Sequence, residues 1–442
     1  MRRYFYSLLR RYITLFVLER NTAVEIDPMT DALIGKLPQG KVAFRKVQQR
    51  NLPDFPLPPN RVVTFSSIAE LKPDYLVISS LIHYERDVQR MLSDVRAVCA
   101  PATRLLITYY SSLWRPFITI ASKLKLRTKT PELNWLAHED VVNLLSLEDF
   151  ELVQLDQKIL LPFYIPLVSN FVNRYLAPLP LLRNLCLVNI AVARPITADQ
   201  AGSASSVSIV VPARNEAGNI DRLIHRVPRM GPDDEIIFIE GNSTDDTWAA
   251  IQAAQRQHGD RRILIAQQDG KGKGDAVRKG FALATREILM ILDADMTVPP
   301  EDLPKFYNAI VGGKGELING TRLVYPMERQ AMRFLNLLGN KFFALAFSFV
   351  LSQRYKDTLC GTKVLSRSNY EKLNANRSFF GNFDPFGDFD LIFGATRMGL
   401  KIVEVPIIYR ERAYGETNIS RWKHGIILLT MLAFAARKIK FR

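Results

Sequence analysis

The most constraining feature of this 442-residue sequence is a short apolar run that ends abruptly at two aspartates. Residues Ile288 to Leu292 form the unbroken apolar pattern of a strand buried on both faces, and Asp293 and Asp295 follow it directly. Such strands belong to parallel sheets covered by helices, which bind ligands beyond the carboxyl ends of the strands. Two carboxylates at that position can hold a divalent cation through oxygen, although a D-x-D pair can equally cap a turn.

The composition limits the size and the partners of the protein. A chain of this length is too long for one ordinary core, so we expect two domains. With 48% hydrophobic and 23% charged residues the chain is globular, and its net charge of +15 indicates an anionic partner. Nucleic acid, a membrane surface and phosphorylated substrates all fit that charge. The sequence has no nucleic-acid motif with interleaved aromatic residues, which favours phosphates and lipid head groups over nucleic acid.

The cysteines and the N-terminus indicate the cellular compartment. Cys99, Cys186 and Cys360 are far apart and lack C-x-x-C spacing, which predicts buried thiols in a reduced compartment rather than disulfides or a zinc site. Arg10 and Arg11 interrupt the apolar N-terminal stretch, which argues against a signal peptide. We therefore expect a cytoplasmic protein that is peripheral on the inner face of the membrane.

Glycine divides the chain into two parts. Only Gly35 and Gly40 occur in the first 200 residues, whereas the remaining 21 of the 23 glycines follow. Residues 196–206 are rich in alanine, serine, glycine and threonine, as linkers are. We predict an N-terminal domain over residues 1–195, a C-terminal domain over residues 207–424 and a basic helix over residues 425–442 that fits a membrane interface or a core.

The N-terminal domain alternates strands with helical patterns, which predicts an α/β fold with a parallel sheet. The four predicted strands are Thr22–Asp27, Lys41–Arg45, Tyr75–Ser79 and Arg104–Tyr109. Together with residues 74–83 and 134–140, this pattern resembles the class I methyltransferases that use S-adenosylmethionine. The resemblance implies a Rossmann-like methyltransferase fold.

Two positions of the N-terminal domain depart from that family. The family has glycines after its first strand, where the backbone approaches the cofactor, and an acid after its second strand, which holds the ribose. This chain has Asp27, Pro28 and Met29 at the first position and Arg45 at the second. We therefore predict a degenerate methyltransferase fold that serves in scaffolding, docking or regulation. A working methyltransferase is the alternative.

The C-terminal domain repeats a unit of strand, polar loop and helix start. Residues 208–219 and 235–247 are the first two repeats, and Gly270 to Gly280 follows a third strand. The alternating glycines and lysines of that third loop would let backbone and ammonium groups approach phosphate oxygens at a helix N-terminus, and they also fit a flexible basic loop. The loop is not a P-loop, because the spacing and the final hydroxyl of that motif are missing.

These strand ends resemble the family 2 nucleotide-sugar glycosyltransferases of the GT-A fold, above all the polyprenyl- and dolichyl-phosphate sugar transferases, over residues 207–424. The resemblance implies that Asp293 and Asp295 hold Mg²⁺ or Mn²⁺ and the donor diphosphate. It implies a nucleotide site lined by Pro212, Arg214, Asn215, Glu216, Glu240 and Lys273. The family usually has two aspartates where this chain has Glu240 and Gly241, so we expect rearranged contacts to the base and ribose.

The resemblance extends to acceptor-side elements later in the chain. Gly320–Arg322 and Asp357–Lys363 match such elements, Asp388 and Asp390 lie at a probable helix start, and Arg412 and Arg421 follow a strand. Arginine suits a diphosphate or a lipid phosphate, and a solvated charged face is the other interpretation. The two acids serve geometry or metal binding for a phosphate acceptor, or general-base catalysis for a hydroxyl acceptor.

The resemblance implies an inverting, metal-dependent transfer of a hexose from a nucleoside diphosphate sugar to a polyprenyl phosphate. One alternative is transfer to a hydroxyl of a sugar or polymer. Another is a non-catalytic regulatory protein that binds nucleotide sugars. The apolar runs 342–351 and 425–436 are too short to span a bilayer and fit interfacial or core helices.

Overall fold

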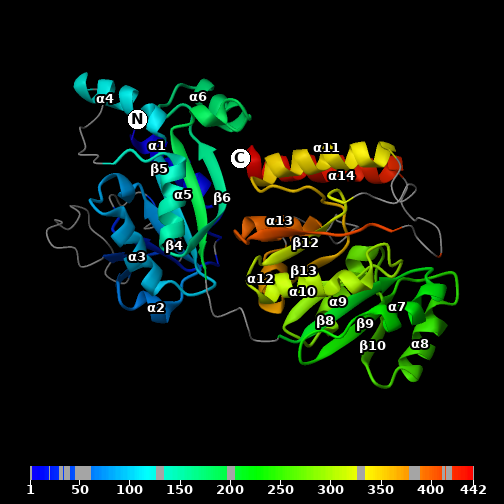
Figure 1. Ribbon diagram of the computed structural model, residues 1–442. Coiled ribbons are helices and arrows are strands. Elements are labelled where there is room, and N and C mark those ends of the chain that lie inside the picture. Colours follow the sequence, from blue (N-terminus) through cyan, green and yellow to red (C-terminus); the bar gives the residue numbers. More distant parts are fainter. Residues whose placement is uncertain are drawn as a thin grey trace. The chain divides into compact units, whose positions relative to one another are not determined.

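A computed structural model describes the chain except residues 1, 19, 29–32, 34–39, 45–60, 126–133, 197–204, 326–333, 378–388, 411–413, 415–420 and 442. The chain forms two compact units (Figure 1). Unit 1 comprises Met1–Thr197 and Arg437–Arg442, and unit 2 comprises Ala198–Ala436. The last six residues thus belong to unit 1, whereas the sequence placed them in one C-terminal helix of residues 425–442.

Unit 1 contains a seven-stranded sheet of order β3-β2-β1-β4-β5-β7-β6. Its strands are β1 Ala23–Ile26, β2 Gly40–Phe44, β3 Val62–Thr64, β4 Tyr75–Ser79, β5 Arg104–Tyr110, β6 Phe150–Lys158 and β7 Val188–Pro195. The first five strands of this order run parallel, while β7 is antiparallel to both of its neighbours. The four predicted strands are confirmed to within one residue at each end.

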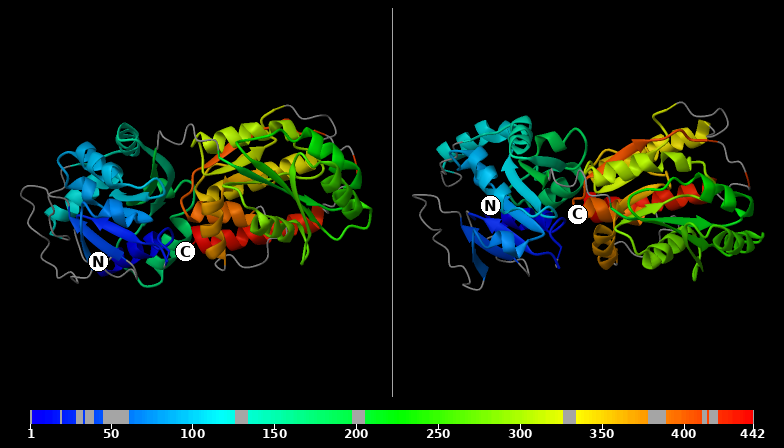
Figure 2. Two further views of the ribbon diagram at one scale, coloured as in Figure 1. Left: turned by 90° about the horizontal axis from the view of Figure 1, so that it is seen from below. Right: turned by 60° about the horizontal axis from the view of Figure 1, so that its bottom comes forward.

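Helices cover both faces of this sheet (Figure 2). They are α1 Arg2–Ile13, α2 Ile68–Leu71, α3 Val88–Val98, α4 Arg115–Lys123, α5 His138–Leu147 and α6 Val168–Phe171. Side chains alternate along each strand, so that Leu76 and Ile78 of β4 pack with α2, α3 and α5, while Tyr75 and Val77 pack with α1. Each face therefore has its own apolar core.

Unit 2 contains a second seven-stranded sheet, of order β10-β9-β8-β11-β13-β12-β14. Its strands are β8 Val207–Ala213, β9 Asp234–Glu240, β10 Arg262–Gln267, β11 Ile288–Ile291, β12 Leu317–Thr321, β13 Lys363–Ser366 and β14 Ile402–Pro406. Strand β13 is antiparallel to β11 and β12, and the other pairs are parallel. All four residues of β11 are buried, which confirms the strand predicted before Asp293.

The helices of unit 2 include a long apolar pair. They are α7 Ile220–Arg226, α8 Thr247–Gln257, α9 Lys273–Leu283, α10 Leu303–Val311, α11 Phe334–Leu351, α12 Arg367–Ala375, α13 Phe389–Arg397 and α14 Arg421–Ala435. The apolar run predicted at 342–351 is the second half of α11, which lies beside α14 (Figure 1). Within the described residues, no helix combines the length and apolarity that a membrane crossing requires.

The register of unit 2 brings four loops to one edge of the sheet. Ala213 at the end of β8 lies opposite Glu240 at the end of β9, which in turn lies opposite Gln267 of β10. Strand β11 runs parallel to β8 on the other side, with Ile291 opposite Val210. The loops that follow these four strands therefore start at the same edge, where parallel α/β sheets bind ligands.

Candidate functional site

An ion pair joins two of these loops. Lys273, the first residue of α9, places its Nζ 2.7 Å from Oδ1 of Asp293, which follows β11. Gly272 precedes the helix with a positive φ of 85°, a conformation that suits glycine and turns the chain into α9. The glycine-lysine loop and the first aspartate of the D-x-D pair therefore meet in one place.

A third segment approaches this ion pair through its backbone. A Cβ at position 361 would collide with the carboxylate of Asp293 and the ammonium of Lys273. Only glycine at this position therefore lets the backbone come so close to the ion pair. Partial burial of Asp293 opposes its ionisation, but the charge and hydrogen bond of Lys273, with the charges of Lys363 and Arg322, lower its pKa. Asp293 is thus held as a carboxylate in a cationic environment.

The second aspartate of the pair is oriented by the turn that follows it. Oδ1 of Asp295 accepts hydrogen bonds from the backbone N–H of Thr297 at 3.1 Å and from its hydroxyl at 2.9 Å. Thr297 is linked in turn to the segment after β14, because the N–H of Arg410 donates to its carbonyl at 3.0 Å. Further along that segment, the ring of Tyr414 lies so close to Gly218 that a Cβ there would be 2.8 Å from Cδ2. Arg410 therefore lies beside the D-x-D turn, and Tyr414 lies beside the loop after β8.

The loops after β8 and β9 are fastened to each other. Asn215 has a backbone φ of 56°. Its side-chain Oδ1 accepts a hydrogen bond from the backbone N–H of Thr244 at 2.8 Å, and its backbone N–H donates to Ser243 Oγ at 3.0 Å. Glu240 accepts from the N–H of Ser243 at 2.5 Å and from Gln267 at 3.1 Å. Burial opposes ionisation of Glu240, but these hydrogen bonds outweigh it and lower its pKa. The predicted nucleotide contact at Glu240 is thus a carboxylate that organises its own loop.

The remaining predicted nucleotide residues differ in exposure. Pro212 lies on β8 opposite Ile239, and Arg214 is exposed just beyond that strand. Glu216 is 5% exposed, and its Oε2 accepts from Asn219 Nδ2 at 2.6 Å. The buried contact gives Glu216 a structural role at the start of α7, beside any contact with a ligand.

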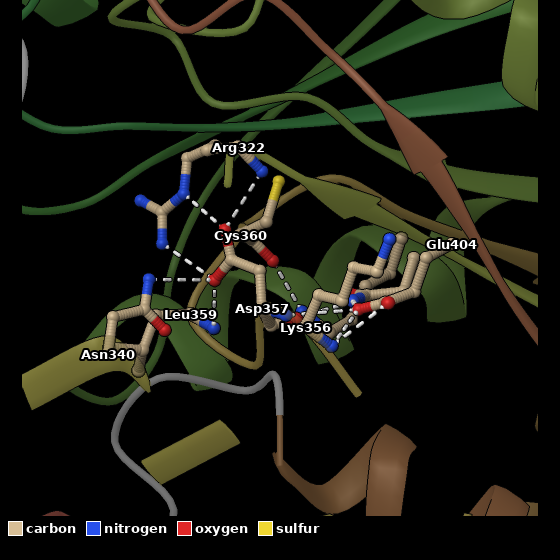
Figure 3. Close-up of polar contacts among 9 residues, drawn as sticks. Arg322, Asn340, Lys356, Asp357, Leu359, Cys360 and Glu404 are labelled. Atoms are coloured by element: carbon tan, nitrogen blue, oxygen red, sulfur yellow. Dashed lines mark hydrogen bonds and ion pairs between the residues drawn. The ribbon is translucent and has the colours of Figure 1, made fainter. Parts of the chain in front are cut away.

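A largely buried ion pair joins Arg322 to Asp357, which precedes Gly361 in the segment 357–363. Arg322 donates from Nε and Nη2 to the two carboxylate oxygens of Asp357, at 2.6 and 2.9 Å, and its backbone N–H donates to the same group (Figure 3). Asn340 and the N–H of Leu359 also donate to Asp357, which is fully buried. Burial opposes ionisation of Asp357, but Arg322 lowers its pKa and keeps it charged. The guanidinium also lies over the ring of Tyr409, 5.0 Å from its centroid.

Two cations that the sequence assigned to acceptor binding point inward instead. Arg322 is engaged by Asp357, and the fully buried Lys363 donates from Nζ to the carbonyl of Cys360 at 2.5 Å. The conformation of residues 357–363 is therefore maintained by buried charge as well as by packing.

The three cysteines are described by the structure. Cys186 and Cys360 are buried as predicted and Cys99 is partly exposed, and no disulfide joins these three described cysteines.

The four residues predicted near the acceptor are only partly described. Asp390 near the start of α13 accepts from Arg377 Nε at 3.0 Å and lies 3.9 Å from Arg278 of α9. Burial raises the pKa of Asp390, although both arginines counteract the rise. Asp388 and Arg412 lie outside the described residues, as does the side chain of Arg421, the first residue of α14.

The chemistry of the D-x-D pair fits a hard divalent cation. Asp293 and Asp295 offer carboxylate oxygens two residues apart, the ligand type that Mg²⁺ and Mn²⁺ prefer. A nucleotide diphosphate would complete such a site. The described residues also contain a group of three side chains that could hold a metal ion away from the D-x-D pair, formed by Asp221 and His225 of α7 with His258. Its Asp221–His258 contact of 2.9 Å is an ion pair when the imidazole is protonated.

Sequence reasoning missed three features of this site. It found the elements that contain Arg322 and Asp357 but not that the two side chains pair, and it did not place Gly361 against Asp293. It also missed the contacts of Arg410 with Thr297 and of Tyr414 with Gly218. The signal available was the dense run of polar and small residues at 357–363, which is unusual before a buried strand.

Comparisons with known proteins agree with this geometry. Residues 208–373 match the protein-family model described as Glycosyl transferase family 2. Residues 208–373, which lie within unit 2, are thus similar to the family 2 glycosyltransferases that the sequence motifs resemble.

Two curated relatives are similar to the C-terminal half of the chain. A dolichol-phosphate mannosyltransferase of Pyrococcus furiosus is 28% identical over 219 residues, which cover 48% of this chain and 59% of the relative. A polyprenol monophosphomannose synthase of Mycolicibacterium smegmatis is 26% identical over 218 residues, covering 48% of this chain and 80% of the relative. Among solved structures, glucosyl-3-phosphoglycerate synthase of Mycobacterium tuberculosis with Mn²⁺ and UDP covers 55% of this chain and 82% of its own, at 19% identity and a TM-score of 0.39.

Proposed function

We propose that unit 2 transfers a hexose from a nucleoside diphosphate sugar to a polyprenyl phosphate at the inner face of a membrane. The observation that carries the proposal is the ion pair of Lys273 with Asp293 beside Asp295, at the edge where four strand-end loops meet. The names of the two curated relatives, which describe transfer to dolichol phosphate and polyprenol phosphate, support the choice of acceptor.

The donor would bind along the loops after β8, β9 and β11. Pro212, Arg214 and the fastened loops of Asn215 and Glu240 would line the nucleoside. Asp293 and Asp295 would hold Mg²⁺ or Mn²⁺, which neutralises charge on a diphosphate. Lys273 would hold Asp293 in its ionised form and supply positive charge next to the phosphates.

The transfer itself would need no general base on the protein. An acceptor phosphate is already an oxyanion, and its oxygen would attack the anomeric carbon while the bond to the diphosphate breaks. The diphosphate leaves with the bonding electrons, and the configuration of that carbon inverts. In this scheme Arg412 and Arg421 would hold the acceptor phosphate, and Asp388 and Asp390 would fix geometry.

The test is a screen of nucleoside diphosphate sugars against polyprenyl phosphates, with Mg²⁺ or Mn²⁺, using the full chain. We expect a glycosylated lipid phosphate, and we expect Lys273→Met to reduce its formation by about tenfold or more because a charge beside the diphosphate is lost. Lys279→Met is the matched control, since Lys279 lies further along α9 and pairs with the exposed Asp269. Equal activity of Lys273→Met and Lys279→Met would contradict the assigned site.

Two other functions remain as outcomes of the same screen. Transfer to sugar or polymer hydroxyls would favour the hydroxyl-acceptor alternative, with an aspartate as base. Donor binding without hydrolysis or product would instead indicate a non-catalytic regulatory protein.

For unit 1 we propose a degenerate methyltransferase-like fold. The order β3-β2-β1-β4-β5 is that of doubly wound nucleotide-binding sheets, which supports the resemblance to class I methyltransferases. Asp27, which takes a positive φ of 44° directly after β1, is 7% exposed, and Pro28 is buried. Met29 and Arg45, the other two departures, lie outside the described residues. Calorimetry of the full chain with S-adenosylmethionine should show no binding. Micromolar affinity would refute the proposal that unit 1 has lost cofactor binding.

A further inference from the structure

One helix of unit 1 is apolar on the side that faces away from the core. Along α4 and its flanking residues, Leu113, Phe117, Ile120 and Leu124 are 57, 64, 54 and 64% exposed. Their spacing of four, three and four residues places them on one helical face. Ile118 of the same helix packs against the core of unit 1 instead. A helix that needed only to cover the core would carry polar residues on its outer face.

A second segment adds to this surface. Between β6 and β7, Leu167 and Leu181 are each 86% exposed, and Tyr164, Phe171 and Leu185 are about half exposed, at 56, 55 and 52%. The indole N–H of Trp114, directly before α4, donates to the carbonyl of Leu185 at 2.8 Å, which joins the two segments. Figure 1 shows α4 and α6 at the same end of unit 1. We call the α4 face and these five residues the apolar end of unit 1.

The N-terminus and the C-terminus of the chain reach the same part of unit 1. The ring of Tyr4 in α1 lies 5.2 Å from that of Tyr164, and its hydroxyl donates to Asn170 at 3.2 Å. At the other terminus, Arg174 donates to the carbonyl of Phe441 at 3.0 Å. Lys440 is buried against Asp156, with its Nζ 3.2 Å from Oδ1. The basic C-terminus is therefore attached to this part of the unit.

The segments that form this end contain basic residues and no acidic ones. Residues 2–18, 111–125 and 157–196 include no aspartate or glutamate. The exposed cations they and the C-terminus contribute are Arg3, Arg115, Lys123, Lys125, Arg183, Arg437 and Lys438. Asp156, which directly precedes the third of these segments, is buried with Lys440 and Lys158. The surface is thus both apolar and strongly positive.

We propose that the apolar end of unit 1 docks onto an anionic lipid bilayer. Exposed Leu, Phe and Tyr side chains surrounded by Arg and Lys are the pattern of interfacial membrane binding, in which apolar burial and attraction to anionic head groups add. Nucleic acid would use the cations but leave the leucines in water. This docking does not depend on the proposed transfer, although it would bring unit 2 to a lipid acceptor.

The experiment is flotation of the full chain with vesicles, in the absence of donor and acceptor, so that its outcome is independent of catalysis. We expect binding to vesicles of equal parts phosphatidylglycerol and phosphatidylcholine, weak binding to phosphatidylcholine alone, and loss of binding as salt screens the charges. The variant Leu167→Glu/Leu181→Glu should bind at least about tenfold more weakly, because two apolar anchors become anions on an anionic surface. Both side chains are 86% exposed, so the fold should tolerate the change, which circular dichroism checks.

Two matched variants make the test specific. Leu147→Glu, at the end of α5, changes a leucine of unit 1 that is 57% exposed but lies outside the apolar end, and it should leave binding unchanged. Leu345→Glu changes a 74% exposed leucine on α11 of unit 2. The proposal is overturned if Leu167→Glu/Leu181→Glu binds vesicles like the unchanged protein, or if Leu345→Glu alone abolishes binding. A change of oligomeric mass in the double variant, with vesicle binding retained, would also overturn it and identify a second copy as the occupant.

Discussion

The two units have sheets of the same size but opposite chemistry at the edge where ligands bind. In unit 2, the loops after β8, β9 and β11 present Asn215, Glu240 and Asp293 to one place, with Lys273 as counter-charge. In unit 1, the residues after β4 and β5 satisfy each other. His83 is fully buried and stacks on Tyr110 with ring centroids 4.9 Å apart.

The hydrogen bonds of His83 and Asn134 show that polar groups at that edge of unit 1 bond to other groups of the same unit. Its Nε2 accepts from the N–H of Tyr110 at 2.8 Å, so Nδ1 carries the proton that is shared with the carbonyl of Asn134 at 2.7 Å. The side chain of Asn134 also donates to the carbonyls of Ile82 and Glu85. The comparison teaches that an α/β sheet provides only a location for a site. Whether the location binds a ligand depends on a few loop residues.

The largest effect should come from neutralising the D-x-D pair. Asp295→Asn should reduce transfer by roughly a hundredfold or more, because several kcal/mol of metal and diphosphate stabilisation are lost without a change of size. Asp27→Asn, the same substitution after β1 of unit 1, should leave transfer unchanged and is the control. Steady-state assays of the two variants decide the matter. If both lose activity equally, or if Asp295→Asn keeps it, the functional contrast between the two edges is wrong.

The next largest effect concerns buried charge in the two units. Asp357→Asn should lower the free energy of unfolding by about 3–5 kcal/mol, because Arg322, whose side chain is only 11% exposed, loses its partner and cannot lose its proton. Asp156→Asn in unit 1 should cost less, because its partners are the lysines Lys440 and Lys158. A buried lysine, unlike an arginine, can lose its proton, and burial already lowers the pKa of Lys158. Denaturant titration measures both, and a larger cost for Asp156→Asn would refute this explanation.

The same aspartate predicts a pH dependence. Because the pKa of Asp357 is lower in the folded chain than its unfolded value near 3.9, its stabilisation is complete above that value and is lost as the pH falls through the folded pKa. Asp357→Asn should therefore lose less stability than the unchanged protein does when the pH is lowered below about 4.

The smallest effect is expected at Asp390, whose pKa is raised by burial. A raised pKa means that the folded chain binds this proton more tightly, so any stabilisation is present at low pH and declines as the pH rises through the folded pKa. Asp390→Asn should change stability at neutral pH by less than about 1 kcal/mol, since Arg377 and Arg278 keep partial access to water. With a phosphate acceptor, the pH–rate profile should be unchanged. Disappearance of one limb of that profile, with donor binding intact, would instead make Asp390 a general base for a hydroxyl acceptor.

The sequence by itself determined the local elements and the residues at their ends. The run before Asp293 predicted a buried strand, and the four predicted strands of unit 1 follow from equally local patterns. The strands β3, β6 and β7 were not predicted. Strand β3 has only three residues, and β6 mixes apolar and polar residues because one of its faces is only partly buried.

Only the tertiary structure decided which charges meet and which apolar residues stay in water. Lys273 and Asp293 are 20 residues apart, Arg322 and Asp357 are 35 apart, and Lys440 and Asp156 are 284 apart. No local pattern specifies such pairs, because they depend on how strands are ordered in the sheet. For the same reason the sequence of α4 looks like that of any helix that packs on a core. Only the structure shows that one apolar face of α4, at the edge of unit 1, stays exposed to solvent.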